Sequence, residues 1–426
     1  MQTKKRVLFY GDSPVTSTGF GVVVKNIAKT IYATGKYDID ILGINFSSTF
    51  YDKKEFPYQI IPAKLEDPND PYGLKMFAKI ILTRQYDIIW IVNDVPVLQP
   101  IAKYIGQMRE SYAKQKLRPP VLIYYYPIDC TLIPEASDMV KIADIPVAYT
   151  YYGVKETLRH IPEVKDRLRQ IYHGMDNAVY HPLSSDERLK YRKQYLKAEE
   201  NDFVIVNVNR NSVRKQMPHT ILAFSEFKKH VPNSKLYLHT NPRDRSPMSP
   251  MPIDLIRCCK DLNLDVTKDV LFPVNYSPAA GYPEYVLNQF YNCADLFMAN
   301  HLGEGMGLSV IEAMAAGVPV LVGNNTNMPE FDGVHLYECK DKAYVDNSGY
   351  RLIGHTQDIV DQMLWIYNNR NKKEVLMSTE QARQWAIAHD WNIVNQAWVK
   401  IFEEAERINP LEVYGKIGNN ISGDNI

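Results

Sequence analysis

The fold is decided by residues 294–320, which read ADLFMANHLGEGMGLSVIEAMAAGVPV. A short apolar run ends near Met298, and a glycine-rich loop follows it. From about Leu308 the apolar residues have helical spacing as far as Gly317, and a second apolar run then covers residues 318–322. A strand, a glycine loop, a helix and another strand in this order are typical of one βαβ unit in a parallel sheet.

Similar apolar runs recur along the chain, separated by spacers of helix length. The first series comprises residues 6–10, 39–42, 87–92, 121–124 and 146–149. The second series comprises residues 203–208, 235–239, 270–272, 295–298 and 318–322. Runs bounded by Gly, Pro or Asp predict parallel sheets with both faces covered by helices. The two series therefore predict an α/β protein of two Rossmann-like, doubly wound domains that face each other across a cleft.

The length of 426 residues also favours two domains, because it exceeds what one hydrophobic core usually organises. The regular series of apolar runs is interrupted at residues 173–183 by a segment with Gly, Asn and Pro. We therefore place the first domain at 1–183 and the second at 184–385. An apolar pattern of helical spacing then predicts a closing helix at 386–408 that crosses back to the first domain. The polar, Gly- and Asn-rich residues 409–426 are expected to form a loose tail.

The composition favours a folded, cytoplasmic protein. Hydrophobic residues make up 45% of the chain, yet no apolar stretch approaches the ~20 residues of a membrane span. The apolar run near the beginning is too short for a secretory signal. The 49 basic and 49 acidic residues cancel, which argues against broad, charge-driven binding to nucleic acid or anionic membrane. The five cysteines lack CxxC spacing, so we expect free thiols and no metal site.

The glycine loop has the chemistry of an anion-binding site. Its three glycines, Gly303, Gly305 and Gly307, allow a ligand to approach the backbone closely, and the helix behind them directs its N-terminal N–H groups at any anion there. Glu304 lies in this loop and Glu312 lies in the helix. The structural alternative is that Glu304 caps the helix N-terminus and Glu312 is an exposed helix residue.

A second group of charges follows the first strand of the second series. Residues 206–216 read VNVNRNSVRKQ and contain Arg210, Arg214 and Lys215. Fixed cations can neutralise the charge that develops on a departing diphosphate without a metal ion. Alone, these residues would be a solvated charge cluster, but their position at the carboxyl end of a strand favours a binding site.

The glycine loop and its helix resemble the E-x7-E motif of the GT4-like family of retaining GT-B glycosyltransferases (glycosyl transferases group 1), which usually reads EGFGLxxxEAMAxGxPV. The resemblance implies that Glu304 hydrogen-bonds hydroxyls of the transferred sugar and that Glu312 binds the ribose hydroxyls of the nucleotide. It also implies that Arg210 and Lys215 stabilise the diphosphate, with Arg214 beside them. The other donor-binding residues that it implies in this region are Gly303, Gly305, Met306, Gly307 and Leu308.

The chain departs from the family pattern at three positions near these motifs. Asn300 stands where Ser is common, Met306 replaces the usual Phe, and Gln216 follows the lysine where Gly or Asn is frequent. These departures bear on the identity of the sugar rather than on activity.

In the first domain, residues 11–21 read GDSPVTSTGFG between a predicted strand and a predicted helix. The family has a Gly-rich loop here, near the donor phosphates and the acceptor, so the resemblance assigns Gly19, Phe20 and Gly21 to donor binding. A dinucleotide-binding fingerprint would need a third glycine, but Val24 occupies that position, which makes NAD binding a weak alternative.

Four further residues are assigned from the same resemblance. Asp129 follows a first-domain strand where relatives carry a group that lines the acceptor side; it either orients the acceptor hydroxyl or the sugar, or caps the segment after it. Val274 and Asn275 stand at the strand end that borders the nucleobase in relatives. His173 lies in a segment that resembles the family's interdomain linker, and the adjacent turn residues favour a structural histidine.

These observations predict a retaining, metal-independent glycosyltransferase. The expected donor is a UDP- or GDP-sugar, with no further cofactor, and the expected acceptor is a hydroxyl of a glycan, a lipid or another compound. One alternative is a viral-type enzyme that glycosylates a hydroxylated DNA base; it would need a basic stripe in the first domain, for which the available residues are Lys4, Lys5, Arg6, Lys114, Lys116 and Arg118. Another is a sugar-nucleotide-binding protein without catalysis. The oligomeric state stays open.

Overall fold

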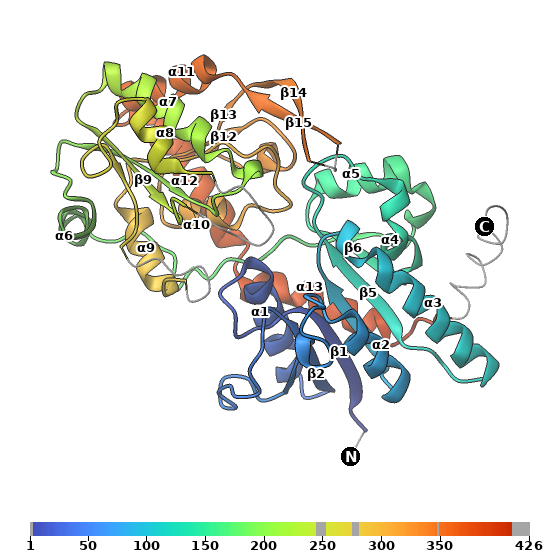
Figure 1. Ribbon diagram of the computed structural model, residues 1–426. Coiled ribbons are helices and arrows are strands. Elements are labelled where there is room, and N and C mark those ends of the chain that lie inside the picture. Colours follow the sequence, from blue (N-terminus) through green and yellow to red (C-terminus); the bar gives the residue numbers. More distant parts are fainter. Residues whose placement is uncertain (1–2, 244–252, 275–280, 347–348, 411–426) are drawn as a thin grey trace. The chain divides into compact units, whose positions relative to one another are not determined.

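The computed structural model describes residues 3–243, 253–274, 281–346 and 349–410 (Figure 1). The chain divides into two compact units, of which the first comprises Met1–His173 with Trp391–Ile426 and the second comprises Gly174–Asp390. Each unit contains a parallel sheet with helices on both faces. The predicted α/β architecture of two Rossmann-like sheets is confirmed.

The first unit has a seven-stranded sheet in the order β3-β2-β1-β4-β5-β6-β7, and all its strand pairs are parallel. Its elements are β1 (Lys5–Asp12), α1 (Gly19–Ala33), β2 (Tyr37–Ile44), β3 (Gln59–Pro62), α2 (Leu74–Thr83), β4 (Ile88–Val92), α3 (Gln99–Lys114), β5 (Val121–Tyr126), α4 (Asp138–Ile142), β6 (Ile145–Ala148), α5 (Tyr151–His160), β7 (Arg169–Gln170) and α13 (Trp391–Ala405).

The central strands of this sheet are buried on both faces, so they are apolar throughout rather than alternating. On one face, Leu8 and Tyr10 of β1 belong to a core that includes residues of α2, α3 and α4. On the other face the helix α13 returns from the end of the chain, and its Trp398 ring centroid lies 5.7 Å from that of Trp90 and 4.7 Å from that of Tyr125. The predicted closing helix therefore belongs to the first unit.

The second unit has a six-stranded parallel sheet in the order β10-β9-β8-β11-β12-β13 and a separate antiparallel hairpin, β14-β15. Its elements are α6 (Ser185–Leu196), β8 (Phe203–Val208), α7 (Met217–His230), β9 (Ser234–His239), α8 (Leu255–Asp261), β10 (Val270–Leu271), α9 (Glu284–Asn292), β11 (Leu296–Ala299), α10 (Leu308–Ala315), β12 (Val320–Gly323), β13 (His335–Tyr337), β14 (Cys339–Asp346), β15 (Gly349–Gly354), α11 (Thr356–Asn369) and α12 (Lys373–Ala388).

The boundary between the units differs from the expected one at residue 183. Residues 174–183 join the second unit, because the N–H of Met175 donates to the carbonyl of His389 and the N–H of Leu183 donates to Asn292 Oδ1. The helical pattern expected at 386–408 is likewise interrupted after α12, and α13 begins only at Trp391. The expected loose tail falls mainly on residues 411–426, which lie outside the described residues.

His173 is structural within the described first unit, as its turn context indicated. The side chain is buried, its Nδ1 is 2.8 Å from Tyr125 Oη, and its ring packs against Tyr149 at 4.2 Å between centroids. Burial lowers its pKa to about 3. All five cysteines are free thiols. Within the described residues, the helices are too short or too polar for any to span a membrane.

Candidate functional site

Two loops of the second unit leave its sheet at the same edge. Strands β8 and β11 are parallel neighbours, with Leu296 paired to Ile205 and Phe297 to Val206. The segments that follow their carboxyl ends are therefore adjacent, which is where open α/β sheets place ligands. One segment carries the cations and the other carries the glycine loop.

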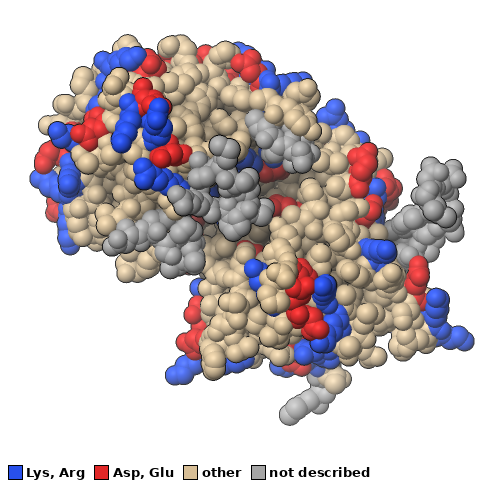
Figure 2. Space-filling view, viewed as in Figure 1, with Lys and Arg blue, Asp and Glu red and all other residues tan. Residues whose placement is uncertain are grey.

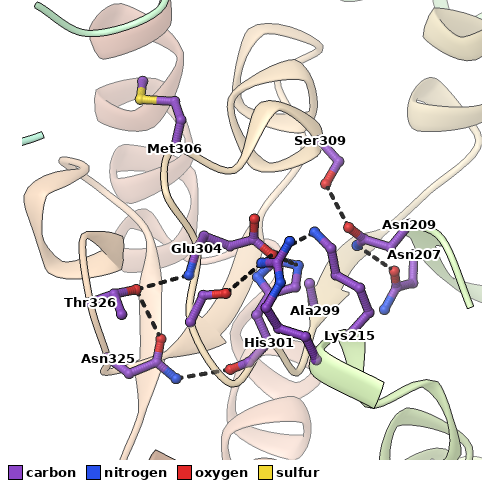
Figure 3. A network of polar contacts seen from close by, with 12 residues as sticks. Asn207, Asn209, Lys215, Ala299, His301, Glu304, Met306, Ser309, Asn325 and Thr326 are labelled. Atoms are coloured by element: carbon purple, nitrogen blue, oxygen red, sulfur yellow. Dashed lines mark hydrogen bonds and ion pairs between the residues drawn. The ribbon is translucent and has the colours of Figure 1, made fainter. Parts of the chain in front are cut away.

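The centre of the site is the carboxylate of Glu304, which is only 5% exposed (Figure 3). Its Oε1 lies 2.5 Å from Lys215 Nζ and 2.8 Å from Arg214 Nη1. The ring of His301 approaches the same oxygen, with Nε2 at 3.6 Å. Arg214 also donates to the carbonyl of Gly303 at 2.6 Å, which ties the cationic segment to the glycine loop.

The cations decide the ionisation of this carboxylate. Burial by itself raises the pKa of Glu304, but the positive charges of Arg214 and Lys215 outweigh it and hold the pKa well below the ordinary value. Glu304 is therefore an anion across the physiological range. Burial also lowers the pKa of His301 to about 3, so its imidazole is neutral there.

Residues after β12 fix the loop from the other side. Thr326 Oγ1 accepts from the N–H of Glu304 at 3.1 Å, and Asn327 Nδ2 donates to the carbonyl of Met306 at 2.8 Å. Thr326 has a φ of 44°, in the left-handed region that a β-branched residue rarely adopts. Strain of this kind is typical of functional sites, since the surrounding structure must hold it in place.

The glycine loop ends at the N-terminus of α10. Gly307 is the N-cap, with a φ of 87°, and among the described residues no side chain caps the helix there. The positive end of the helix dipole and the first N–H groups of α10 are thus suited to an anion. A chain of polar side chains ties this end to β8: Ser309 Oγ donates to Asn209 Oδ1 at 3.4 Å, and Asn209 Nδ2 donates to Asn207 Oδ1 at 2.8 Å.

Several buried polar atoms at this edge have no hydrogen-bond partner among the described residues. They are Asn207 Nδ2, Asn211 Oδ1, both amide atoms of Asn300 and both ring nitrogens of His301. Each of these residues is at most 7% exposed. Since buried polar atoms are nearly always hydrogen-bonded, such a concentration points to a polar ligand.

Glu312 lies in a different group, between α10 and α9. Its Oε2 accepts a hydrogen bond of 2.5 Å from Tyr291 Oη, and Tyr180 also hydrogen-bonds it. Burial raises the pKa of Glu312 to about 7, with a further contribution from the charge of Glu284. The two glutamates thus differ: Glu304 is held ionised, whereas Glu312 titrates near neutral pH.

Comparison with known proteins agrees with the fold of the chain. Residues 265–367 match the family model described as Glycosyl transferases group 1, and no curated protein sequence matches the chain. Sucrose-phosphate synthase from Thermosynechococcus elongatus is 14% identical with a TM-score of 0.68, over 94% of this chain and 99% of that one. A glycosyltransferase from Rickettsia africae is 15% identical with a TM-score of 0.69, over 95% and 99%. An α,α-trehalose-phosphate synthase (UDP-forming) from Burkholderia vietnamiensis is 12% identical with a TM-score of 0.66, over 94% and 99%.

The chain has the GT-B fold. Its second unit carries the group 1 segment, and the chain is similar to the GT4-like glycosyltransferases. The segment that matches the family model begins before α9 and ends within α11, so it includes the glycine loop and both glutamates.

We call Glu304 and the polar residues around it the Glu304 group; they are Asn207, Asn209, Arg214, Lys215, His301, Asn325 and Thr326. Not every residue assigned from the GT4-like resemblance joins this group. Arg210 is exposed, and its side chain makes no hydrogen bond or ion pair within the described residues. Arg214, at the η5 turn (Val213–Lys215), contacts Glu304 instead. Met306 is buried and Leu308 half-buried, and Figure 3 draws the Met306 side chain apart from the Glu304 group. Val274 is 77% exposed, and Asn275 lies outside the described residues.

In the first GT-B unit the assigned residues have separate settings. Gly19 is exposed and Phe20 half-buried in the first turn of α1. Gly21 is buried against the preceding loop, where a Cβ atom would meet Thr16 O at 2.6 Å, so close packing explains this glycine. Asp129 is half-buried in the segment after β5.

Sequence reasoning missed several residues of the Glu304 group. Asn207 lies inside β8, where an asparagine in an otherwise apolar strand is a signal that could have found it, and Asn209 follows the end of this strand. Asn325 and Thr326 directly follow the buried strand β12, and the rule that places ligands at carboxyl ends could have found them. His301 had no such signal, because a lone histidine in a loop does not reveal its burial.

Proposed function

We propose that this protein is a retaining glycosyltransferase that moves a sugar from a nucleotide-sugar donor to an acceptor hydroxyl without a metal ion. UDP- and GDP-sugars are the expected donors, and the acceptor is a hydroxyl of a glycan, a lipid or another uncharged compound. The GT-B fold and the group 1 segment support glycosyl transfer as the reaction class.

The observation that carries this proposal is the convergence of Lys215, Arg214 and Glu304 beside the uncapped N-terminus of α10. Two cations and a helix dipole suit a diphosphate, and a permanently ionised carboxylate suits sugar hydroxyls, which donate hydrogen bonds to it. Glu312, which can accept hydrogen bonds in its ionised form, is suited to ribose hydroxyls. These groups would bind a nucleotide-sugar along its length.

The reaction follows from these roles. The bond between C1 of the sugar and the diphosphate oxygen breaks, and Lys215, Arg214 and the N-terminus of α10 stabilise the negative charge that collects on the diphosphate. Glu304 holds the sugar hydroxyls while C1 becomes positively charged. The acceptor oxygen bonds to C1 on the face that the diphosphate leaves, and the acceptor proton passes to the departing diphosphate. Configuration at C1 is thereby retained.

A donor screen tests this proposal. The purified chain is incubated with UDP-, GDP- and ADP-linked hexoses and pentoses, and release of free nucleoside diphosphate is measured with and without simple glycans. Wild-type protein should turn over at least one donor, and Glu304→Gln should lower that turnover by about 100-fold or more. Glu226→Gln is the matched control, since Glu226 pairs with Lys229 on the surface of α7. Wild-type protein inert toward every donor would contradict the proposal. A fully active Glu304→Gln variant would show that Glu304 and its loop do not take part in turnover.

The DNA-modifying alternative has less support in the first unit. Its candidate basic residues precede β1 and β5 or begin β1, so they lie at the amino edge of the sheet, and Lys4 and Arg6 are each 3.5 Å from an aspartate. The carboxyl ends of β1, β4 and β5 instead carry Asp12, Asp94 and Asp129. On the face drawn in Figure 2, basic and acidic side chains are interspersed. Carboxylates at this edge would repel phosphates and favour an uncharged acceptor.

A further inference from the structure

His301 lies beside the carboxylate of Glu304 and is only 3% exposed. Its Nε2 is 3.6 Å from Glu304 Oε1, just beyond hydrogen-bond distance, and neither ring nitrogen has a hydrogen-bond partner among the described residues. Burial of an imidazole without hydrogen bonds is unfavourable. An apolar residue would fill this position at lower cost, so the histidine indicates a role that the free protein does not complete.

The loop after β12 holds the backbones of both residues in place. Asn325 Nδ2 donates to the carbonyl of His301 at 2.9 Å, and Thr326 Oγ1 accepts from the N–H of Glu304 at 3.1 Å. A further hydrogen bond of 3.4 Å joins Thr326 to Asn325 (Figure 3). The backbones that carry the imidazole and the carboxylate are therefore fixed, with His301 Nε2 and Glu304 Oε1 3.6 Å apart.

The two cations that contact Glu304 are also the ones that would bind a diphosphate. Its Oε1 is contacted by Lys215 Nζ at 2.5 Å and by Arg214 Nη1 at 2.8 Å. If these cations turn to the diphosphate of a bound donor, the ion pairs weaken. A buried carboxylate that loses its partners is strongly destabilised unless another donor replaces them. The neutral imidazole, with its proton on Nε2, is the donor nearest at hand.

We propose that His301 is a positioning residue for sugar transfer: its Nε2–H hydrogen-bonds Glu304 and holds that carboxylate against the sugar hydroxyls when Lys215 and Arg214 turn to the diphosphate. This inference rests on the proposed function. Because this hydrogen bond forms when the cations leave Glu304 for the diphosphate, His301 contributes both to turnover and to nucleoside diphosphate affinity.

The test uses three variants of the full chain. His301→Ala removes the donor, whereas His301→Gln can place an amide N–H near the position of Nε2. His335→Ala is the matched control for loss of a partly buried histidine in the same unit, since His335 begins β13 at the opposite edge of the sheet and bonds Ser378 at 3.0 Å. For each variant we would measure the turnover of a donor accepted by wild-type protein, the Kd for the matching diphosphate by calorimetry, and the Tm.

His301→Ala should lower kcat by about 10- to 100-fold, the range of a lost charge-assisted hydrogen bond, and weaken diphosphate binding, while the Tm stays near that of wild type. His301→Gln should recover most of the lost kcat, and His335→Ala should keep wild-type turnover. An unchanged kcat in His301→Ala would overturn the inference alone, as would parallel losses of kcat, diphosphate affinity and Tm without rescue by glutamine. Wild-type protein that neither binds a diphosphate nor turns over a donor would overturn the proposed function and this inference with it.

Discussion

At the scale of single residues, two glutamates eight positions apart are driven in opposite directions by their surroundings. Glu304 is buried, yet the charges of Arg214 and Lys215 lower its pKa, whereas burial without a cation raises the pKa of Glu312 to about 7. Paired carboxylates with separated pKa values are characteristic of functional sites. The contrast also makes Glu312 a measurable contributor to the pH dependence of stability.

The part of the free energy of unfolding that comes from protonation of Glu312 should be lost as pH rises. Its pKa is higher in the folded chain, at about 7, than the ordinary value of 4.5, so the folded state binds more protons than the unfolded state between these values. The free energy of unfolding should therefore fall from about pH 4.5 to pH 7 and then level off. Urea unfolding of wild type and Glu312→Gln at pH 5, 6, 7 and 8 measures this, because contributions of other groups cancel in the difference. A difference between the two proteins that does not change with pH would contradict the assignment.

At the scale of elements, two helix glycines that look alike in the sequence have different surroundings in the structure. Gly21 lies in the first turn of α1 against the preceding loop, where a Cβ atom would lie 2.6 Å from a backbone oxygen of Thr16. Gly106 lies within α3, and a Cβ atom there would have no neighbour within 4 Å in the part of the chain that the structure describes. The first glycine is required by packing and the second is a helix residue with excess flexibility.

Alanine substitutions should separate these two cases. Gly21→Ala should destabilise the protein by about 1–3 kcal/mol, because backbone must shift to admit the methyl group. Gly106→Ala should stabilise it by about 0.5–1 kcal/mol through helix propensity. Chemical denaturation of both variants beside wild type measures the two effects. Equal and small changes at both positions would mean that the loop before α1 is less tightly packed than the structure has it.

Elements with long, strongly apolar patterns were predictable from the sequence, and weakly patterned ones were not. The runs at β1, β4, β8 and β11 indicated buried parallel strands, because only such strands are apolar without alternation. The two-residue strand β7 and the three-residue strand β13 are too short to leave a periodic signal. The break between α12 and α13 could not be predicted for another reason. The helical spacing of apolar residues is the same before and after His389 and Asp390, although the chain passes there from one unit to the other.

At the scale of the whole molecule, the first unit is built from both ends of the chain. Trp398 of α13 is fully buried against Trp90 and Tyr125, and Phe402 packs against Phe9 with ring centroids 5.9 Å apart. Residues nearly 400 positions apart thus share one core. A domain boundary inferred from the order of the runs cannot reveal this, because it depends on packing between distant segments.

Loss of Trp398 should loosen the first unit and leave the second intact. Trp398→Ala should cost about 3–5 kcal/mol, the usual range for a buried tryptophan. Hydrogen exchange followed by mass spectrometry should then show faster exchange in β1, β4 and β5, with β8 and β9 unchanged. Trp385→Ala is the matched control in the second unit, where Trp385 packs against Phe331 at 4.8 Å between centroids. This substitution should speed exchange in β8 and β9 and leave β1, β4 and β5 unchanged. Equal loss of protection in both units after either substitution would contradict their division.

The candidate site was predictable in part. Glu304, Lys215 and the glycines stood out because charged and glycine residues in the loops after apolar strands are unusual without a ligand. The contact between Arg214 and Glu304 could not be read from the sequence, since it depends on the η5 turn, and the assignment of Arg210 to the diphosphate stays a prediction. Burial of His301 and the strained backbone of Thr326 are likewise properties of the folded loop alone.

We propose that Lys215 and its neighbours form a diphosphate site, and calorimetric titration of the protein with UDP, GDP and ADP measures binding there. Wild-type protein should bind at least one of the three, and Lys215→Ala should bind it about 10- to 100-fold more weakly, as expected for loss of one charged hydrogen bond. Lys229→Ala, which removes an exposed lysine of α7, should bind like wild type. Equal affinity of the wild-type and Lys215→Ala proteins, or no binding of any nucleoside diphosphate, would show that Lys215 and its neighbours are not a diphosphate site.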